Sequence, residues 1–401
     1  VECLFFSDRG MFRILTLNNI SAKGLGKFPG DRFELASDVA DPHAIVLRSH
    51  KLTQEHATPS LLAVGRAGAG VNNIPVAEYT GRGIVVFNTP GANANAVKEL
   101  VLAGLLLSRR GIVQGIEYVE SLKTESDKVA LNSQVEASKK QFKGSELKGK
   151  RLGILGLGAI GSMVAEMGLQ LGMQVQGYDP TLSIESAWRL SSQVQKMDNI
   201  QALFSKSDIV TLHVPALPET ERLINSDVLS FARKNAILLN FARAEIVDTA
   251  AIKQALDAGQ LSQYISDFPT PELIGMAGVM ATPHLGASTA EAEENCAVMV
   301  ADQMLDFLQN GNIVNSVNFP AVYLERSKEG CRIAITNRNV PRILGSILSV
   351  LADHDINVID MLNKSRQEVA YNLIDVATEV SSDLETEIGK IEGVLNVRMF
   401  N

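Results

Sequence analysis

The sequence has few cysteines, and their arrangement suggests neither a disulfide framework nor a metal site. Cys3, Cys296 and Cys331 are three in number and far apart, and no C-x-x-C pair or histidine at metal-ligand spacing accompanies them. Disulfide-rich domains need paired cysteines, and structural zinc needs closely spaced ligands. We therefore expect no disulfide scaffold and no bound metal, and we expect the reducing environment of the cytoplasm.

Long hydrophobic runs and an excess of positive charge are also missing. The longest apolar run, around residues 100–107, is interrupted by Gly104 and is much shorter than the ~20 residues of a membrane helix. The chain carries 45 acidic and 37 basic side chains, which gives a formal net charge of −8. A field of this sign repels polyanions. The sequence thus argues against a membrane span and against non-specific binding to nucleic acid.

The chain is long enough for more than one domain. At ~150 residues per domain, its 401 residues allow two or three hydrophobic cores. Charged residues make up 20% of the chain, and its 31 glycines and 13 prolines are typical of globular proteins. Residues 1–10 lack the basic start and the cleavage site of a signal peptide, and Met11 resembles a natural start. We therefore treat these ten residues as an extension outside the fold.

Short apolar runs alternate with helical patterns along most of the chain. Strands are predicted at residues 13–17, 44–47, 61–64, 85–87, 151–155, 174–178, 208–214, 236–241, 264–267 and 278–281. Helices are predicted at residues 93–109 and 289–309, and residues 121–150 read as a polar connection. Strands separated by helices are typical of parallel sheets. The predicted fold class is α/β, with two Rossmann-like, doubly wound sheets.

The last part of the chain has a different order of elements. Strands are predicted at residues 332–336, 356–364, 369–379 and 394–400, and helices at 343–354 and 384–391. This order, βαββαβ in about seventy residues, is that of a ferredoxin-like domain. A third, C-terminal domain is therefore expected.

A glycine-rich segment supplies the first functional motif. Gly156, Gly158 and Gly161 match G-x-G-x-x-G at the junction of an apolar strand and a helix, and Asp179 ends the next strand. Such glycines allow a tight turn, the approach of a pyrophosphate and close helix packing, while the helix N-terminus attracts the anion. An acid at Asp179 can bind both ribose hydroxyls and favours NAD over NADP. The alternative role of Asp179 is to form the turn before Pro180.

Two further residues suit the chemistry of a hydroxyacid. Arg243 follows a predicted strand, and its guanidinium can bind a carboxylate or keto-acid in a bidentate manner; a solvated loop arginine is the alternative. His284 can accept a hydroxyl proton while hydride leaves the carbon, and a nearby carboxylate would stabilise the imidazolium. The other five histidines fit core or surface positions better: His43, His50, His56, His213 and His354.

Together these segments resemble the NAD-dependent D-2-hydroxyacid dehydrogenases. The resemblance is carried by GLGAIG with Asp179, NFARAEIVD, the spacing of Asp267 and Glu272, TPHLGAST, and residues 66–73 and 87–91. It covers nearly the whole chain from Met11 and is strongest to the members that oxidise 3-phospho-D-glycerate. It implies a discontinuous substrate domain of residues 11–107 and 289–320, an inserted NAD-binding domain of residues 108–288, and a C-terminal domain of residues 330–401.

The resemblance also implies roles for individual residues. Arg243, Glu272 and His284 take the catalytic positions; Glu272 is placed by spacing, and Asp267 is the alternative carboxylate. The NAD contacts fall on Ala69, Gly156, Gly158, Ala159, Ile160, Gly161, Asp179, Val214, Phe241, Ala242, Arg243, Asp267, His284, Gly286 and Ala287. The substrate contacts fall on Ala67 and Gly68 for the carboxylate, and on Arg48, Ser49, Arg66 and Asn93 for the phosphate.

The C-terminal segment resembles an ACT domain, a small-molecule regulatory fold. By this resemblance, Asn339 and Asn357 would hold L-serine across a subunit interface. Arg342 and Asn337 stand where that family usually has a glycine and a histidine. The alternative is a domain that serves only assembly. A homodimer or homotetramer is expected in either case.

The implied reaction is the NAD-dependent oxidation of a small phosphorylated 2-hydroxyacid. Its substrate would be 3-phospho-D-glycerate and its product 3-phosphohydroxypyruvate, which is the first step of the phosphorylated route to L-serine. One alternative is a D-2-hydroxyacid dehydrogenase acting on glyoxylate, hydroxypyruvate, lactate or unphosphorylated glycerate. The other is an NAD-sensing binding protein, because the C-terminal-binding corepressors resemble the same scaffold.

Overall fold

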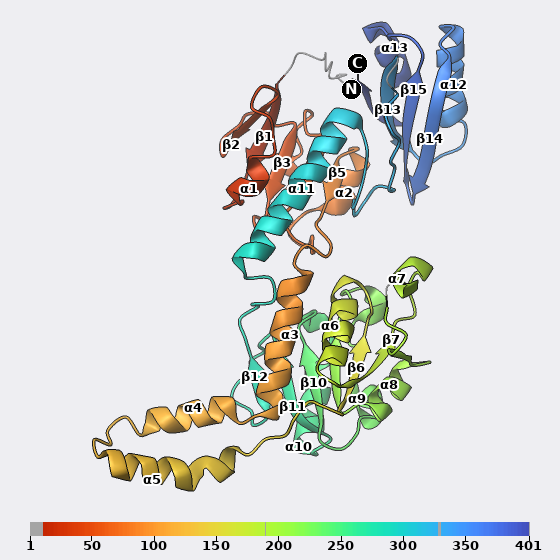
Figure 1. The fold of residues 1–401 in the computed structure, drawn as a ribbon. Coiled ribbons are helices and arrows are strands. Elements are labelled where there is room, and N and C mark those ends of the chain that lie inside the picture. Colours follow the sequence, from red (N-terminus) through yellow and green to blue (C-terminus); the bar gives the residue numbers. More distant parts are fainter. Residues whose placement is uncertain (1–10, 189, 328–329, 401) are drawn as a thin grey trace. The chain divides into compact units, whose positions relative to one another are not determined.

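The computed structural model describes residues 11–188, 190–327 and 330–400, and the chain divides into two compact units (Figure 1). The first unit consists of the chain up to Asn93 and from Ala290 onward, and the second is Ala94–Thr289. The predicted extension, residues 1–10, lies outside the described residues. None of the described helices is both long enough and apolar enough to cross a membrane.

A five-stranded parallel sheet forms the centre of the first unit. Its strands are β1 (Phe12–Thr16), β2 (Phe33–Ala36), β3 (Ala44–Leu47), β4 (Ala63–Arg66) and β5 (Val85–Phe87), in the order β2-β1-β3-β4-β5. Its helices are α1 (Ala22–Leu25), α2 (Val76–Gly81) and α11 (Ala290–Asn310), with a 3-10 turn at Gln54–His56. The order reverses between β1 and β3, so ligand-binding residues are expected at the carboxyl ends of these strands.

Helix α11 packs directly on this sheet because two glycines leave room for it. A Cβ on Gly65 would collide with Met304 and Val300 of α11, and a Cβ on Gly24 would collide with Ala297. The buried side chains of α11 share one core with β1, β3, β4 and β5. The helix is therefore part of the first unit although the whole second unit precedes it in the chain.

The C-terminal segment adds an antiparallel sheet to the first unit. Its elements are β13 (Cys331–Arg338), α12 (Ile343–Asp353), β14 (Val358–Arg366), β15 (Val369–Val376), α13 (Ser382–Gly389) and β16 (Val394–Phe400), with the strand order β14-β15-β13-β16. Helices α12 and α13 share one core with this sheet. Tyr371, Leu373 and Phe400 instead join the core that α11 shares with the first sheet.

Two buried arginines of this sheet bind the C-terminal end of α11. Arg398 donates to the carbonyls of Phe307 and Leu308 at 3.2 and 2.8 Å, and burial lowers its pKa to about 10. Arg332 forms a two-point ion pair with Asp375, at 2.6 and 2.9 Å, and also donates to the carbonyl of Asn310. Positive charge at the end of a helix stabilises its unpaired carbonyls.

A seven-stranded parallel sheet forms the second unit. Its strands are β6 (Arg151–Leu155), β7 (Gln174–Tyr178), β8 (Gln195–Lys196), β9 (Ile209–Leu212), β10 (Ala236–Asn240), β11 (Leu261–Ser266) and β12 (Val279–Ala281), in the order β12-β11-β10-β9-β6-β7-β8. Its helices include α6 (Ala159–Gln170), α7 (Ile184–Trp188), α8 (Ile200–Lys206), α9 (Ser226–Ser230) and α10 (Thr249–Asp257). The two parallel sheets and the small C-terminal sheet confirm the predicted α/β fold class.

The second unit begins with α3 (Ala94–Arg109). Residues 94–107 were predicted to belong to the substrate domain, but in the structure they form part of the second unit. Helix α3 packs on α6, β10 and β11. Gly104 allows this packing, because a Cβ there would lie 3.0 Å from the ring of Phe241. The polar stretch after α3 is largely helical rather than a plain connection.

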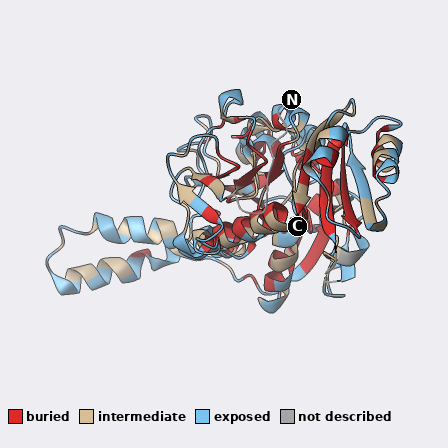
Figure 2. Ribbon diagram, turned by 90° about the horizontal axis from the view of Figure 1, so that it is seen from above, coloured by how far each residue is buried: buried red, intermediate tan, exposed pale blue. Residues whose placement is uncertain are grey.

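A helical hairpin follows α3, and its surface is mostly exposed (Figure 2). It consists of α4 (Ile112–Ser121) and α5 (Lys128–Ser138), followed by a 3-10 turn at Lys139–Phe142. The hydroxyl of Tyr118 donates to the carbonyl of Gln134 and joins the two helices. The side chain of Asp127 accepts from two backbone amides and caps the start of α5. This cap explains why such a polar sequence becomes helical.

Candidate active site

The glycine-rich turn joins β6 to α6 at the centre of the seven-stranded sheet. Gly156 adopts φ of 90°, and a Cβ there would lie 2.6 Å from the carbonyl oxygen of His213. A Cβ on Gly161 would collide with the carbonyl oxygen of Gly156. In contrast, nothing lies within 4 Å of a Cβ built on Gly158. Gly156 and Gly161 are thus required by the turn itself, whereas Gly158 leaves space for an approaching ligand.

The carboxylate of Asp179 lies beside this turn at the end of β7. One of its oxygens accepts from the amide of Leu157 at 2.8 Å, and the other accepts from the amide and hydroxyl of Thr181 at 2.9 Å each. Asp179 therefore forms the turn before Pro180 and also ties that turn to the glycine-rich segment. The turn-forming role considered for Asp179 is thus observed, and its role in binding the ribose stays a prediction.

The order of strands reverses between β6 and β9, next to the glycine-rich turn. His213 and Val214 follow β9, and the His213 amide donates to the carbonyl of Leu155 at 2.7 Å. The His213 ring contacts the hydroxyl of Thr211 at 3.0 Å, and desolvation lowers its pKa to about 3. This histidine is neutral at physiological pH, which agrees with the structural role expected for it.

Arg243 follows β10 and is positioned by a buried asparagine. The side chain of Asn240 donates to the Arg243 carbonyl at 2.9 Å and accepts from the Ala242 amide at 3.1 Å. The Arg243 guanidinium donates to the carbonyl of Ala242 at 2.6 Å, and no carboxylate pairs with it among the described residues. Phe241, which precedes these residues, is buried. The fork of Arg243 is therefore available to an anionic group.

The loop that follows β12 is organised around the buried carboxylate of Asp267. One of its oxygens accepts from the Thr282 hydroxyl at 2.7 Å and the Leu285 amide at 2.6 Å, and the other accepts from the Gly286 amide at 2.7 Å. The carbonyl of Asp267 accepts from the amide of His284 at 3.1 Å. Asp267 thus holds the backbone on both sides of the histidine.

His284 has a left-handed backbone conformation, with φ of 56°. This conformation is unfavourable for a residue with a Cβ, and such strain is concentrated at functional sites. The ring is exposed, and its centroid lies 5.0 Å from that of Phe268. The Asp267 contacts therefore hold an accessible imidazole in a conformation that the chain would not otherwise favour.

Glu272 lies farther from a strand end along the chain than Arg243 or His284. It lies in a turned segment between β11 and β12, and its side chain is exposed. Within the described residues it has no hydrogen bond or ion pair with His284. The structure brings Arg243, Asp267 and His284 to neighbouring strand ends, together with Gly286 and Ala287, but it does not pair Glu272 with the histidine.

In the first unit, Arg48 and Ser49 of the expected phosphate residues follow β3, and Arg66 is the last residue of β4. The Arg48 guanidinium forms an ion pair with Glu293 of α11 at 2.5 Å, and the Arg66 side chain donates to the carbonyl of Arg48 at 3.0 Å. The amides of Arg48, Ser49 and His50 all donate to one oxygen of Asn18, at 3.3, 3.0 and 2.8 Å. Asn93 closes the first unit immediately before α3.

The amides expected to bind the substrate carboxylate already have partners. The Ala67 amide donates to the carbonyl of Leu47 and the Gly68 amide to the carbonyl of Arg66, both at 2.8 Å. The next two amides, of Ala69 and Gly70, donate to no acceptor within the described part of the chain. The side chain of Asn88 holds this segment by donating to the Ala69 carbonyl at 2.6 Å.

Comparison with known proteins links these features to one family. Residues 113–286 match the family model described as D-isomer specific 2-hydroxyacid dehydrogenase, NAD binding domain. The D-3-phosphoglycerate dehydrogenase of Haemophilus influenzae is 34% identical over 383 residues, which is 92% of this chain and 89% of the relative. The chain belongs to the D-isomer-specific 2-hydroxyacid dehydrogenases, in the D-3-phosphoglycerate dehydrogenase branch.

Other members of the family support this assignment. The D-3-phosphoglycerate dehydrogenase of Escherichia coli is 30% identical over 92% of this chain and 89% of its own length. The crystal structure of NAD+-bound 3-phosphoglycerate dehydrogenase from Entamoeba histolytica has a TM-score of 0.61 and 25% identity, and it covers 77% of this chain and 99% of its own. The chain is an NAD-dependent oxidoreductase of this family.

NAD is the cofactor of the family, and the second unit fits it. Gly158 leaves open space at the N-terminus of α6, where a pyrophosphate binds in such sheets, and Asp179 supplies a carboxylate at the end of β7. Ala159 and Ile160 open α6, and Val214 follows the neighbouring strand β9. No group of three or more potential metal ligands occurs among the described residues.

In this family member, the asparagines proposed to hold serine lie at opposite ends of the C-terminal sheet. Asn339 follows β13 and donates to the carbonyl of Gln367 at 3.0 Å, next to the start of β15. Asn357 precedes β14, whose first residue pairs with the last residue of β15. Eight residues of β15 separate the two positions, which corresponds to roughly 25 Å. One chain therefore cannot bring both asparagines to one small ligand.

Sequence reasoning missed several residues that organise the site. Asn18 binds three amides near Arg48, Asn240 fixes the backbone at Arg243, and the Asn73 side chain donates to the carbonyls of Arg48 and His50 at 3.3 and 2.6 Å. Asparagine after an apolar strand is common in loops, so the sequence carries only a weak signal for these roles. The positions of Asn18 and Asn240 at the carboxyl ends of β1 and β10 become informative once the sheets are known.

Proposed function

We propose that this enzyme oxidises 3-phospho-D-glycerate with NAD to 3-phosphohydroxypyruvate, the first step of the phosphorylated route to L-serine. One observation carries the proposal: Asp267 holds His284 in a strained, exposed conformation after β12, at the edge of the sheet where Arg243 follows β10. The relatives that share most of this chain are D-3-phosphoglycerate dehydrogenases. We also propose a cytoplasmic location, as expected for a biosynthetic enzyme.

In this proposal, His284 and Arg243 act on the hydroxyacid itself. Bound NAD supplies the hydride acceptor. His284 takes the proton from the substrate hydroxyl while the hydrogen on the same carbon leaves as hydride, so that a carbonyl forms. Arg243 binds the carboxylate and stabilises the developing carbonyl oxygen. Glu272 is proposed as the carboxylate that supports the imidazolium, on its spacing alone.

The backbone would complete the binding of the carboxylate. The Ala67 and Gly68 amides already donate within the chain, whereas those of Ala69 and Gly70 are available. We therefore propose that the amides of Ala69 and Gly70, rather than those of Ala67 and Gly68, bind the substrate carboxylate. The segment is held in place by Asn88, so its donors are positioned before a substrate binds.

The direct test measures NADH formation by the purified protein with NAD and 3-phosphoglycerate. We expect turnover, and we expect His284→Asn to lower kcat by about 10²–10⁴-fold, because it removes the general base. NADH binding by this variant should be retained, which shows that the fold is intact. Near-normal turnover of His284→Asn would remove this residue as the acid–base group.

The same assay distinguishes the alternative functions. Turnover of glycerate, lactate or glyoxylate without turnover of 3-phosphoglycerate would support another 2-hydroxyacid dehydrogenase. Tight NADH binding without oxidation of any 2-hydroxyacid would support a binding protein of the corepressor type. The strained His284 favours catalysis, because a protein that only binds NAD does not need a positioned imidazole.

The phosphate group is assigned to the first unit, at Arg48, Ser49, Arg66 and Asn93. Glu293 already pairs with Arg48, so a bound phosphate would have to compete with this carboxylate. We expect Arg48→Ala with Arg66→Ala to raise the KM for 3-phosphoglycerate at least tenfold while the KM for NAD changes little. The control is Lys51→Ala, an exposed cation in the same unit. An equal change in both KM values would contradict the phosphate assignment.

The C-terminal sheet is proposed to be an ACT-like domain that binds L-serine between subunits. The distance between Asn339 and Asn357 in one chain supports a site built from two chains. A homodimer or homotetramer is therefore part of the proposal. Titration with L-serine during the NADH assay, together with the mass of the particle in solution, tests both points. An unaffected rate would leave the domain a role in assembly.

A further inference from the structure

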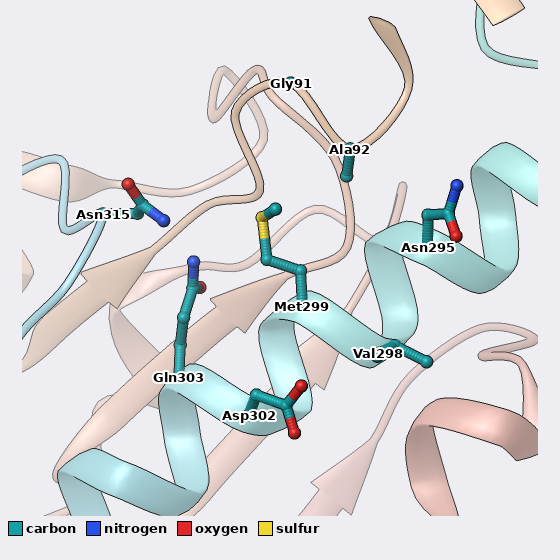
Figure 3. Close-up of a pocket in the computed structure, with 8 residues that line it drawn as sticks. All are labelled: Gly91, Ala92, Asn295, Val298, Met299, Asp302, Gln303 and Asn315. Carbon is teal, nitrogen blue, oxygen red and sulfur yellow. The ribbon is translucent and has the colours of Figure 1, made fainter. Parts of the chain in front are cut away.

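A pocket of about 500 Å³ lies in the first unit beside α11 and is separate from the residues assigned to substrate or cofactor (Figure 3). One side is formed by Asn295, Met299 and Gln303, which follow one another at intervals of four residues along the helix. The other side is formed by the loop at Ala92 and by Asn315. The volume is within the range of small-molecule sites.

Gln303 is the unusual residue of this pocket. It is 8% exposed, and within the described chain neither its side-chain nitrogen nor its side-chain oxygen has a hydrogen-bond partner. Figure 3 shows its carboxamide directed from α11 towards Asn315 and Met299. Burial of a carboxamide without partners is unfavourable, and nearly all such groups in folded proteins are paired. The unpaired donor and acceptor therefore indicate a missing partner in the pocket.

The charges and the surroundings limit what this partner can be. Of the residues that line the pocket, only Asp302 is charged, and it pairs with Lys27 at 3.0 Å. No free charge is left to attract an ion. Asn295 and Asn315 add further amide groups, and Met299 and Val298 add apolar surface. This lining suits a neutral polar group with an apolar part.

We propose that this pocket binds a small molecule through a neutral edge that carries a hydrogen-bond donor next to an acceptor, as in a primary carboxamide. Both carboxamide atoms are buried, so such an edge pairs with them at two points once the Gln303 side chain has turned out into the pocket. A carboxylate of the same shape can only accept, so it would leave the Gln303 oxygen unpaired. An adenine edge has the same donor and acceptor arrangement and is a second source of this chemistry.

Titration of the full-length protein, without cofactor or substrate, tests the proposal. L-Glutamine and adenine are titrated separately while the side-chain amide signal of Gln303 is followed by NMR, and L-glutamate serves as the carboxylate control. We expect a saturable shift with a dissociation constant of about 1 mM or tighter for at least one of the two ligands. Binding of adenine alone would assign the site to nucleobases, and binding of L-glutamine alone to carboxamides.

Matched variants separate this site from others. Gln303→Met keeps the length of the side chain and removes its hydrogen-bonding groups, so calorimetry should show at least tenfold weaker binding. Gln254→Met, an exposed glutamine in α10, should bind as the unaltered protein does. If Gln303→Met does not fold, Met299→Trp, which fills the pocket, replaces it and should also abolish binding.

Three results would overturn the proposal. The first is that neither ligand causes a saturable shift of the Gln303 signal. The second is that L-glutamate and L-glutamine bind equally well. The third is that the Gln303 signal changes only with protein concentration. The last result would mean that a second copy of the chain covers the pocket. None of these results depends on turnover, so they are independent of the proposed oxidation of 3-phosphoglycerate.

Discussion

At the scale of single residues, one buried carboxylate, that of Asp267, shapes the catalytic loop. Asp267 was expected to contact NAD or to serve as the alternative carboxylate beside the histidine. Its two oxygens accept three hydrogen bonds from the loop around His284. We therefore regard Asp267 as a positioning residue, which acts on the reaction through the backbone of the histidine.

Asp267→Asn tests this role. The amide nitrogen of asparagine would replace one accepting oxygen and face a backbone N–H, so a buried donor loses its partner at a cost of about 1–3 kcal/mol. We expect a lower melting temperature, and we expect kcat to fall at least tenfold because His284 loses its fixed position. The control is Asp257→Asn, which removes an exposed ion pair with Lys253. An unchanged kcat with a lowered melting temperature would restrict Asp267 to stability.

The sequence predicts some residues of the site better than others. Gly156, Gly161 and Asp179 act within one strand–turn–helix unit, so their roles follow from a local pattern. The partners of Asp267 lie fifteen or more residues away, and only the folded loop brings them together. Arg342 marks another limit: it stands where a glycine was expected and adopts φ of 78°, a strain that the sequence alone could not show.

At the scale of elements, the turn between β6 and α6 separates glycines needed for folding from a glycine that leaves room for cofactor. A Cβ on Gly161 collides with backbone, whereas a Cβ on Gly158 meets nothing. Substitutions at Gly158 and Gly161 can therefore measure the role of the motif in cofactor binding separately from its role in folding.

Gly158→Ala should keep the cofactor-free protein as stable as before, because the added methyl group has space. The same methyl group would stand where the pyrophosphate approaches, so the dissociation constant for NADH should rise at least tenfold. Gly161→Ala should instead lower the melting temperature of the cofactor-free protein. Calorimetric titration with NADH and thermal unfolding measure the two effects. A destabilised Gly158→Ala would show that this glycine also serves the fold.

Other elements show why local patterns miss secondary structure. Strand β2 is a short edge strand, Phe33–Ala36, with a charged residue inside it, and it was not predicted. Helix α5 lies in residues 121–150, which were predicted to be a polar connection because they show no apolar face. The Asp127 cap and the hydrogen bond from Tyr118 of α4 stabilise the helix. Strand β2 thus depends on pairing with β1, whereas α5 depends on a local cap that hydrophobic periodicity does not reveal.

At the scale of the whole molecule, two buried titratable groups of the first unit give stability opposite dependences on pH. Desolvation, with the nearby charges of Arg13 and Arg398, lowers the pKa of His43 to about 4. Desolvation raises the pKa of Glu385, in α13, to about 7. Neutral His43 contributes fully to the unfolding free energy above its ordinary pKa of 6.5, and this contribution is lost as the pH falls through 4. Protonated Glu385 contributes fully to the unfolding free energy below its ordinary pKa of 4.5, and this contribution is lost as the pH rises through 7.

Glu385→Gln isolates the second effect. The variant stays neutral at every pH, so we expect it to gain on the order of 2 kcal/mol of unfolding free energy at pH 8 and little at pH 5. Chemical unfolding of both proteins at pH 5 and pH 8, followed by a signal from the first unit, measures the difference in unfolding free energy. Glu392→Gln, an exposed glutamate of the same sheet domain, is the control. A gain of equal size at both values would show that ionisation is not its cause.

The insertion of Ala94–Thr289 into the first unit also orders events during synthesis. Strands β1 to β5 leave the ribosome before the inserted unit, but Gly24 and Gly65 leave gaps that α11 fills, and the end of α11 is bound by arginines of β13 and β16. The inserted sheet contains all of its own strands and can close earlier. The first sheet is therefore made before the inserted sheet but completes its core after it, and its uncovered apolar face stays exposed until α11 has been made.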